Sequence, residues 1–223
     1  LTEIAPPLWA QGIGSSLIAT GVAGVVLFLY ISRTETLSTR LSAIQRSGLK
    51  DIFPGRSVVI RDKYEERLKS AREIDIMGFG LSSLREDHLY HFVQWSYRAN
   101  VRIILIDPTY PSSDYSYSSQ RDMEEGNPNG RIAGEVRKFI DETKSLPGLN
   151  RSRFRIRLMR ALPSTNVFRV DDEVFFGPYL MGEQSRNSPT FLVSRGGSLF
   201  TSITTHFDRI WSDDRLSIEV PLD

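Results

Sequence analysis

The most restrictive feature of this sequence is the charge pattern of its N-terminal part. Residues 4–32 contain no charged side chain, and all 28 Lys and Arg residues of the chain follow them. As a helix, the apolar part of this run, residues 12–32, would span about 30 Å, which is the thickness of a bilayer's hydrocarbon core. Only a helix could bury the backbone polar groups of such a segment in lipid. We therefore predict a transmembrane helix over residues 12–32.

The charges on either side of this run predict its orientation. A cleaved signal peptide would have basic residues before the apolar run, whereas here only Glu3 precedes it and Arg33 follows it. Because the basic side of a membrane helix tends to lie in the cytoplasm, we predict a single-pass protein of the inner (plasma) membrane that contacts the lipid bilayer through the helix. The predicted parts are an extracytoplasmic tail (1–11), the transmembrane helix (12–32), a juxtamembrane helix or linker (33–52) and a cytoplasmic domain (53–223).

The composition excludes several classes of function. The 28 basic residues nearly balance the 27 acidic ones, so global charge gives no argument for a nucleic-acid partner. The chain has no cysteine, which excludes disulfides and thiolate metal sites. His88 and His91 lie three residues apart, but no second pair of metal ligands at matching spacing accompanies them. The sequence therefore predicts neither a metal site nor a cofactor.

The domain after residue 53 alternates between short apolar runs and longer amphipathic stretches. This alternation predicts a layered α/β/α domain with a mixed sheet covered on both faces. A polar segment, residues 107–129, interrupts the pattern, and loops of this length are typical of lids, binding loops or disordered inserts. The predicted strands are 74–78, 101–106, 154–160, 167–170, 174–176 and 191–194, and the predicted helices are 57–73, 84–99, 132–144 and 198–211.

The stretch from Phe154 to Trp211 has a distinctive order of elements. A strand leads into the segment LPSTN, which is followed by a hairpin (VFRVDDEVFFGPYL), a further strand and a helix that ends in HFDRIW. This order resembles the core of the phospholipase D superfamily, and the resemblance extends over about residues 53–213. It implies a phospholipase D-like fold for the whole domain.

The catalytic pair of that family is missing from this chain. Family members have a His-x-Lys pair, and an Asp follows the Lys after four residues. With Asp171 at the Asp position, the His position falls on Ser164 and the Lys position on Asn166, while Gly177 lies about one residue from the family spacing. A serine without a neighbouring base does not readily replace a histidine nucleophile. The resemblance therefore implies a sterile member, a domain that binds a ligand for signalling and does not cleave it.

The strand ends and the resemblance together indicate where such a ligand would bind. Open α/β sheets bind ligands at the carboxyl ends of their strands, and the family's substrates contain phosphate. Family members with a single motif pair two copies across a shared cleft, so the resemblance also implies a homodimer. The residues that we expect around a phosphate-bearing small molecule are Ser82, Asp107, Ser164 and Asn166, with Arg121 and Arg169 as charge partners.

A row of arginines offers a second candidate site. Arg151, Arg153, Arg155 and Arg157 recur at every second residue, so on a strand their side chains share one face. One interpretation is an edge strand protected by charge against pairing with another sheet. The other is an anion-binding row for an anionic lipid headgroup, a nucleotide or a nucleic-acid backbone.

Two further classes of function stay open at this point. The domain could be a structural scaffold with protein partners in a membrane assembly, which the balanced charge suits. Alternatively, it could be a phosphodiesterase or nuclease with a rearranged site, in which His206 acts with Arg121 or Arg169. His206 lies on the last predicted helix, far in sequence from the family motif, and a place at the edge of the core is its simpler explanation.

Overall fold

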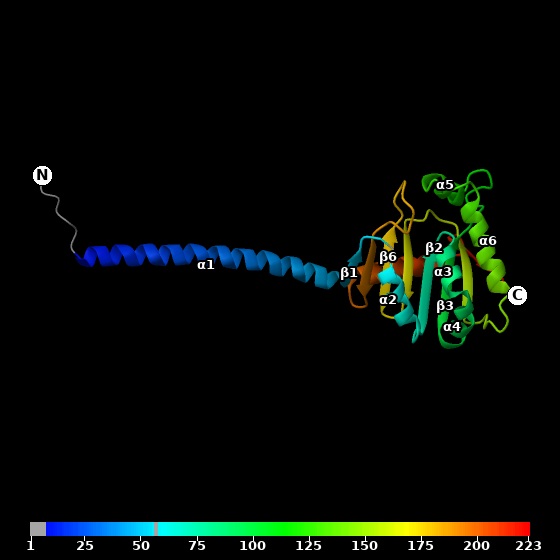
Figure 1. Cartoon of the computed structure of the whole chain (residues 1–223), viewed down its shortest axis with the longest axis horizontal. Coiled ribbons are helices and arrows are strands. Elements are labelled where there is room, and N and C mark those ends of the chain that lie inside the picture. Colours follow the sequence, from blue (N-terminus) through cyan, green and yellow to red (C-terminus); the bar gives the residue numbers. More distant parts are fainter. Residues whose placement is uncertain (1–7, 56–57) are drawn as a thin grey trace. The chain divides into compact units, whose positions relative to one another are not determined.

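The structure is a computed structural model that describes the backbone of residues 8–55 and 58–223, and the side chains of residues 20–33, 37–55 and 60–223. The chain forms two compact units, residues 1–45 and residues 46–223. The first unit consists of most of one long helix, and the second contains all the strands (Figure 1).

The N-terminal helix α1 runs from Leu8 to Ser47. Among the described residues, no helix is both long enough and apolar enough to cross a membrane. The prediction of a transmembrane helix over 12–32 is therefore wrong, and so is the inner-membrane localisation that followed from it. The predicted tail, 1–11, falls largely outside the described residues.

The second unit is built on one mixed sheet of eight strands in the order β1-β7-β6-β5-β2-β3-β4-β8. The strands β2, β3 and β4 are parallel to one another, and every other neighbouring pair is antiparallel. The sheet thus confirms the predicted mixed α/β domain. The strands are β1 (Leu49–Phe53), β2 (Glu73–Gly78), β3 (Asn100–Ile106), β4 (Phe154–Met159), β5 (Thr165–Val170), β6 (Glu173–Pro178), β7 (Thr190–Ser194) and β8 (Ser217–Val220).

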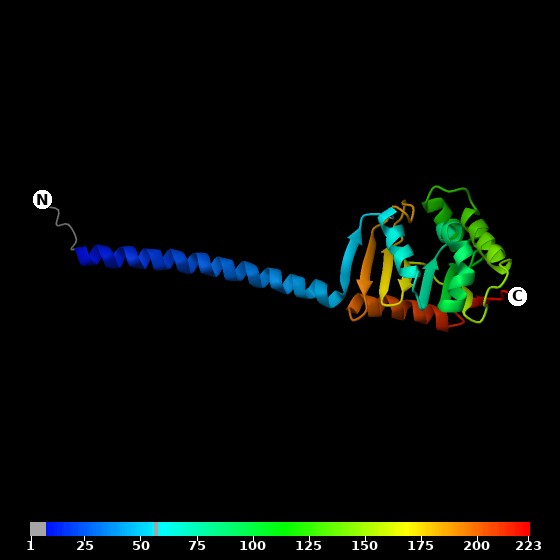
Figure 2. The ribbon, with the colours of Figure 1, turned by 60° about the horizontal axis from the view of Figure 1, so that its bottom comes forward.

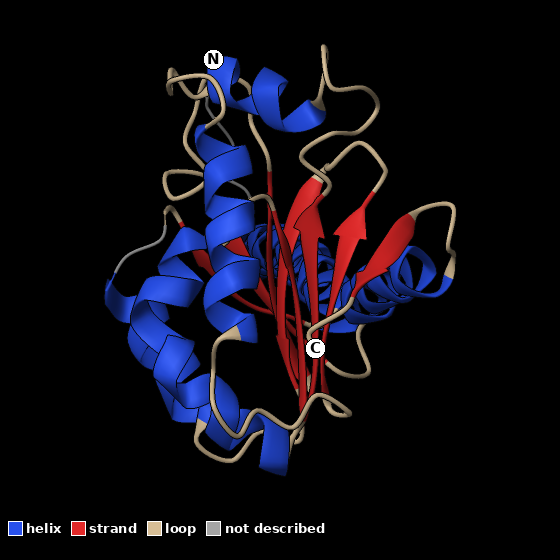
Figure 3. Ribbon diagram, turned by 90° about the vertical axis from the view of Figure 1, so that its right-hand side faces the viewer, coloured by secondary structure: helices blue, strands red, loops and turns tan. Residues whose placement is uncertain are grey.

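Helices cover both faces of this sheet (Figures 2 and 3). One face is covered by α2, α3, α4 and α6, while α7 lies alone across the other, which we call the α7 face. Tyr64 of α2 stacks on Phe168 of β5 on the first face, and Arg169 of β5 lies over Phe200 of α7 on the second. The helices are α2 (Val58–Leu68), α3 (Ser82–His88), α4 (Phe92–Arg98), α5 (Tyr117–Glu124), α6 (Arg131–Lys144) and α7 (Ser198–Ser212).

The hydrophobic pattern explains this arrangement. The interior strand β3 is almost continuously apolar and is buried from Ile103 to Ile106, as a strand covered on both faces must be. In α6, the buried residues Ile132, Val136 and Phe139 recur at helical spacing, so that this helix presents one apolar stripe to the sheet.

The structure differs from the predicted elements at three places. The predicted helix 84–99 is two helices, α3 and α4, joined by a 3-10 turn at Leu89–His91. The segment 107–129 contains helix α5, whose Arg121 is buried, and is therefore not a disordered insert. The two outer strands β1 and β8 were not predicted, because each has only four or five residues with a half-buried pattern.

Candidate ligand-binding site

A cavity of about 460 Å³ opens where β2 ends and α3 begins. Here the carboxyl end of β2 lies beside the start of the antiparallel strand β5, and open α/β sheets bind ligands outside the carboxyl ends of their strands. The turn between β2 and α3 contains Leu81, whose positive φ of 49° is costly for a residue with a side chain. Such strained backbone is common at binding sites, where the surrounding packing maintains it.

The inner part of the cavity is apolar. Ile76 and Phe168 lie side by side on β2 and β5, and the ring of Tyr64 stacks on Phe168 at a centroid distance of 4.3 Å. The volume is in the range typical of pockets for small organic molecules. The other apolar residues of the lining are Ile60, Met77, Phe79, Leu81, Leu84, Ile132 and Val167.

Three arginines, Arg61, Arg131 and Arg186, contribute to the lining from different parts of the chain. Arg131 donates a hydrogen bond of 2.5 Å to Asn127. No ion pair between any of the three and another described residue is present. These cations are therefore available to an anion.

The carboxylates of the lining are mostly neutralised from outside the cavity. Glu125 pairs with Arg121 at 2.8 Å, and Glu135 pairs with the buried Arg85 at 3.1 Å. Asp87 is the remaining acidic residue of the lining, and it forms no ion pair with a described residue. The arginines without a partner thus outnumber the carboxylates without one, and the cavity is expected to attract anions.

One wall of the cavity is the segment between β6 and β7, and Arg121 holds it in place. The Arg121 side chain is only 2% exposed and donates hydrogen bonds to the carbonyl oxygens of Leu180 (2.8 Å) and Glu183 (2.7 Å). A second link joins the Ser185 hydroxyl to Glu125 at 3.2 Å. Arg121, which the sequence suggested as a ligand contact, therefore lies behind the wall and positions it.

His88 also lines the cavity, at the end of α3. Burial lowers the pKa of His88, with the nearby His91 and Arg61 acting in the same direction and the carboxylates of Asp87 and Glu65 opposing them. The neutral imidazole is thus favoured at this position. It can accept or donate a hydrogen bond without adding a charge.

The other residues predicted for a ligand site are dispersed. Ser82, at the start of α3, lines the cavity. Asp107 lies after β3, where burial would raise its pKa, but hydrogen bonds from Arg160 and Thr109 outweigh burial and lower it. Asn166 is buried on β5, opposite Gly177 of β6. Neither Asp107 nor Asn166 is among the described residues that line the cavity.

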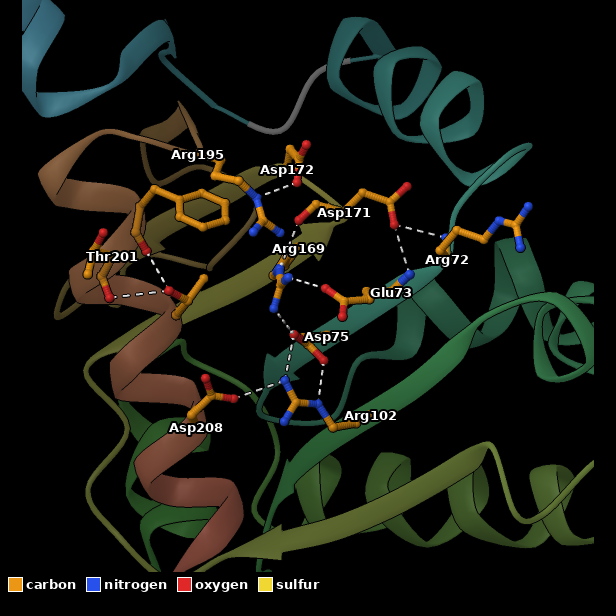
Figure 4. Close-up of polar contacts among 12 residues, drawn as sticks. Arg72, Glu73, Asp75, Arg102, Arg169, Asp171, Asp172, Arg195, Thr201 and Asp208 are labelled. Carbon is orange, nitrogen blue, oxygen red and sulfur yellow. Dashed lines mark hydrogen bonds and ion pairs between the residues drawn. The ribbon is translucent and has the colours of Figure 1, made fainter.

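Arg169 lies on the α7 face of the sheet, where carboxylates occupy it (Figure 4). It donates to Asp75 at 2.9 Å and forms a second ion pair with Glu73. Asp75 is 3% exposed and also accepts two hydrogen bonds, of 2.6 and 2.8 Å, from Arg102. We call Glu73, Asp75, Arg102, Arg169 and Asp208 the α7-face network, in which Asp208 pairs with Arg102 at 2.9 Å.

His206 and Ser164 both line a second, shallow hollow on the α7 side. No hydrogen bond between these two described side chains is present, and the remaining lining is mainly apolar. Burial lowers the pKa of His206, and the positive charge of Arg209 adds to this effect. Arg121 and Arg169, the partners suggested for His206 in a rearranged site, are bonded elsewhere.

The arginine row divides into two pairs. Arg151 and Arg153 precede β4, and their guanidinium groups donate to backbone carbonyl oxygens. Arg155 lies over the ring of Trp211, and Arg157 bonds to Asp214 and Ser217. Because β4 lies between β3 and β8, it is not an edge strand, and the interpretation as edge protection is wrong.

The cavity arginines were not singled out from the sequence. Arg61 belongs to a helix with mixed charges, and Arg186 lies in a segment without a recognisable motif. The only signal for the site was the turn after β2, which provided Ser82. Arg131 lies at the start of a predicted helix, where a cation is unfavourable because it opposes the helix dipole. That position alone does not indicate a binding site.

Comparisons with known proteins identify no family. No family model and no curated protein sequence matches the chain. Among solved structures, the chain is similar to TrmBL2, an archaeal chromatin protein whose structure shows a novel mode of DNA binding, with 14% identity, a TM-score of 0.45 and coverage of 96% of this chain and 72% of that one. It is also similar to the phosphatidylserine synthase of Haemophilus influenzae Rd KW20, with 12% identity and a TM-score of 0.48.

That alignment covers 76% of this chain but only 39% of the synthase, so this chain spans less than half of its length. TM-scores below 0.5 at such identities say nothing about activity or ligands. The order of elements on which the phospholipase D resemblance rests, a strand, a hairpin, a strand and a helix, is present as β4, β5-β6, β7 and α7.

Proposed function

We propose that this chain is a non-catalytic binding module for a small organic anion with an apolar body, a phosphate ester being the preferred class. The observation on which this depends is the cavity beside β2, whose interior is apolar and whose lining includes Arg61, Arg131 and Arg186 without carboxylate partners. Arginine binds phosphate through two parallel hydrogen bonds. An apolar body would pack against the rings of Tyr64 and Phe168.

The chemistry of the lining supports binding in preference to catalysis. The cavity has no cysteine, and no described histidine is hydrogen-bonded to its serine hydroxyl groups, those of Ser82, Ser83 and Ser185. Ser164 and Asn166 stand where the phospholipase D family has its His and Lys. A nucleophile would need a base within hydrogen-bond reach. The arrangement therefore favours a sensor over a phosphodiesterase.

The homodimer is part of this proposal. Leu37, Leu41 and Ile44 follow the spacing of a coiled-coil seam along α1, and they are 57%, 64% and 49% exposed. A second copy of α1 would cover them. In size-exclusion chromatography with light scattering, the full chain is expected to be a dimer and the Leu41→Glu variant a monomer. A wild-type monomer would remove this part of the proposal.

Binding is tested with 1-naphthyl phosphate, which joins an apolar ring system to a phosphate, by isothermal titration calorimetry on the full chain. Arg61→Ala and Arg186→Ala are each expected to weaken binding about tenfold, because a hydrogen bond to a charged group contributes about 1.5–3 kcal/mol. Arg209→Ala is the matched control, since Arg209 is exposed on α7, outside the cavity.

Two results would count against the cavity as the site. One is a wild-type protein that binds 1-naphthol as tightly as 1-naphthyl phosphate, which would mean that the arginines do not recognise the anion. The other is equal affinity of the wild type, the two cavity variants and the Arg209 control, or no binding by any of them.

A further inference from the structure

Each of the three parallel strands is preceded by an arginine. Arg72 comes directly before β2, Arg98 lies two residues before β3, and Arg153 comes directly before β4. Parallel strands begin at the same edge of a sheet, and their N-terminal ends lie opposite the end at which the cavity opens. The three arginines therefore belong to a region separate from the proposed ligand site.

Backbone hydrogen bonds show that these three strand starts are immediate neighbours. The amide of Asn100 donates to the carbonyl of Arg72 at 2.9 Å, and the amide of Val101 donates to the carbonyl of Arg153 at 2.7 Å. The guanidinium group of Arg153 reaches the carbonyl of Tyr97 at 3.2 Å. Since neighbouring strands lie about 4.8 Å apart, the arginines are spaced along a short line.

Further cations extend this line at both ends. Lys69 lies in the turn before Arg72, and the guanidinium group of Arg151 donates to the carbonyl of Lys144 at 3.2 Å. All six side chains are at least partly exposed. We call them the basic edge: Lys69, Arg72, Arg98, Lys144, Arg151 and Arg153.

No member of the basic edge forms an ion pair with a described residue. Two acidic residues lie beside the β2 end of the basic edge. Glu73 pairs with Arg169, and Asp171 accepts hydrogen bonds of 2.9 and 2.8 Å from the backbone amides of Arg72 and Glu73. Figure 4 shows the guanidinium group of Arg72 directed away from these carboxylates.

An exposed aromatic ring accompanies the cations. Tyr97, next to Arg98 on α4, has 64% of its surface exposed, and its carbonyl is the one that Arg153 contacts. Exposed rings among basic side chains are the stacking platforms of proteins that bind single-stranded nucleic acids.

We infer that the basic edge binds the sugar–phosphate backbone of a single-stranded nucleic acid, with a base stacked on Tyr97. A line of cations fits a linear polyanion, because each cation can neutralise one phosphate and release a counterion. An anionic membrane would attract the same cations, but it presents a flat surface, whereas these cations follow one line of strand starts. The near-zero net charge of the chain does not argue against nucleic-acid binding. Charges act over a Debye length of about 10 Å, so a phosphate near the basic edge responds to the local positive charge there.

The test is fluorescence anisotropy of a labelled 20-nucleotide poly(dT) strand with the full chain, over a range of salt concentrations. The double variant Arg72→Ala, Arg153→Ala is expected to bind at least tenfold more weakly. The negative slope of the logarithm of the binding constant against the logarithm of the salt concentration should become shallower by between one and two. Tyr97→Ala is expected to bind about fivefold more weakly with the salt slope unchanged, because stacking does not release counterions.

The control is the double variant Arg137→Ala, Arg209→Ala, which removes the same charge from exposed positions on α6 and α7. It is expected to bind like the wild type. The inference is overturned if poly(dT) fails to bind at 50 mM salt, or if the two double variants weaken binding equally. It is also overturned if phosphatidylserine vesicles bind through the basic edge while poly(dT) does not, which would assign the edge to a membrane surface.

Discussion

The α7 face of the sheet and the cavity on the opposite face use arginine in contrasting ways. On the α7 face, Arg102 and Arg169 are both bonded to Asp75, a carboxylate that is almost completely buried. In the cavity, Arg61 and Arg186 have no carboxylate partner among the described residues. The number of arginines alone therefore does not identify a binding site, and what distinguishes the two regions is whether a carboxylate already occupies each guanidinium group.

The largest expected effect comes from removing the carboxylate at the centre of the α7-face network. Asp75→Asn keeps the shape of the side chain but leaves Arg102 and Arg169 without their shared anion. Removing one partner of a buried ion pair typically costs about 3–5 kcal/mol of the free energy of unfolding. The lower end is expected here, because Arg102 is partly exposed. Urea unfolding followed by circular dichroism measures it.

Asp208→Asn is the matched control for this prediction. Asp208 pairs with the same Arg102, but half of its side chain is exposed, and exposed pairs contribute less than about 1 kcal/mol. If the two variants had the same free energy of unfolding, burial of the carboxylate would not explain how the α7-face network stabilises the domain.

The second-largest effect is expected at Arg121, which is buried like the arginines of the α7 face but lies at the cavity. Arg121→Ala removes two carbonyl contacts and leaves Glu124 and Glu125 unpaired. We expect a loss of about 2–3 kcal/mol in the free energy of unfolding. Because the wall formed by residues 180–189 loses its attachment, weaker binding of 1-naphthyl phosphate should accompany the loss. Wild-type stability would show that the wall is held by other contacts.

The sequence predicted the fold better than it predicted the site. The strands β2 and β3 are almost continuously apolar, and the helices α6 and α7 each have a clear apolar stripe. The hydrophobic pattern was therefore sufficient to locate these four elements. The four- and five-residue outer strands β8 and β1 have no such signal. The apolar run in α1 satisfied the length rule for a membrane helix, yet the described part of that helix is not long and apolar enough to cross one.

The site residues could not be predicted because their roles depend on contacts that are distant in sequence. Arg169 and Arg186 are indistinguishable as residue types, but Arg169 meets Asp75, 94 residues away, whereas Arg186 meets no described carboxylate. Similarly, Arg151, Arg153, Arg155 and Arg157 have perfect period-two spacing, but the strand begins only at Phe154. Residue spacing predicts which face of a strand a side chain lies on, but it does not predict which residue that side chain contacts.

A smaller effect is expected in the dependence of the free energy of unfolding on pH, because the cavity contains the buried His88. Burial lowers the pKa of His88, while Asp87 and Glu65 oppose this and His91 and Arg61 reinforce it. Because the unfolded chain binds the proton more readily, the stabilising contribution of neutral His88 is complete above about pH 6.5 and is lost as the pH falls from that value through the lower pKa of the folded state. His206, with the same direction of shift, adds to this decrease.

The measurement is the slope of the free energy of unfolding against pH between pH 7 and 5. His88→Gln is expected to reduce this slope, whatever its effect on stability at neutral pH. Tyr90→Phe is the control at an exposed position of the same turn and should retain the wild-type slope. A slope that is unchanged in His88→Gln would contradict the lowered pKa.

The smallest effect is also the sharpest test of the contrast between the two kinds of arginine. If Arg61 and Arg186 have no structural partner, replacing either by Ala should change the free energy of unfolding by less than about 0.5 kcal/mol, as is usual for surface positions. We expect any change to be a slight gain in stability, since three cations that share one cavity repel one another and residues retained for binding often reduce stability. Arg102→Ala, by contrast, should destabilise the domain, because it leaves part of the Asp75 carboxylate unsatisfied. If Arg186→Ala lost more than about 1 kcal/mol of the free energy of unfolding, Arg186 would support the fold and would be removed from the proposed anion site. If its stability were unchanged while 1-naphthyl phosphate bound more weakly, Arg186 would serve the ligand alone.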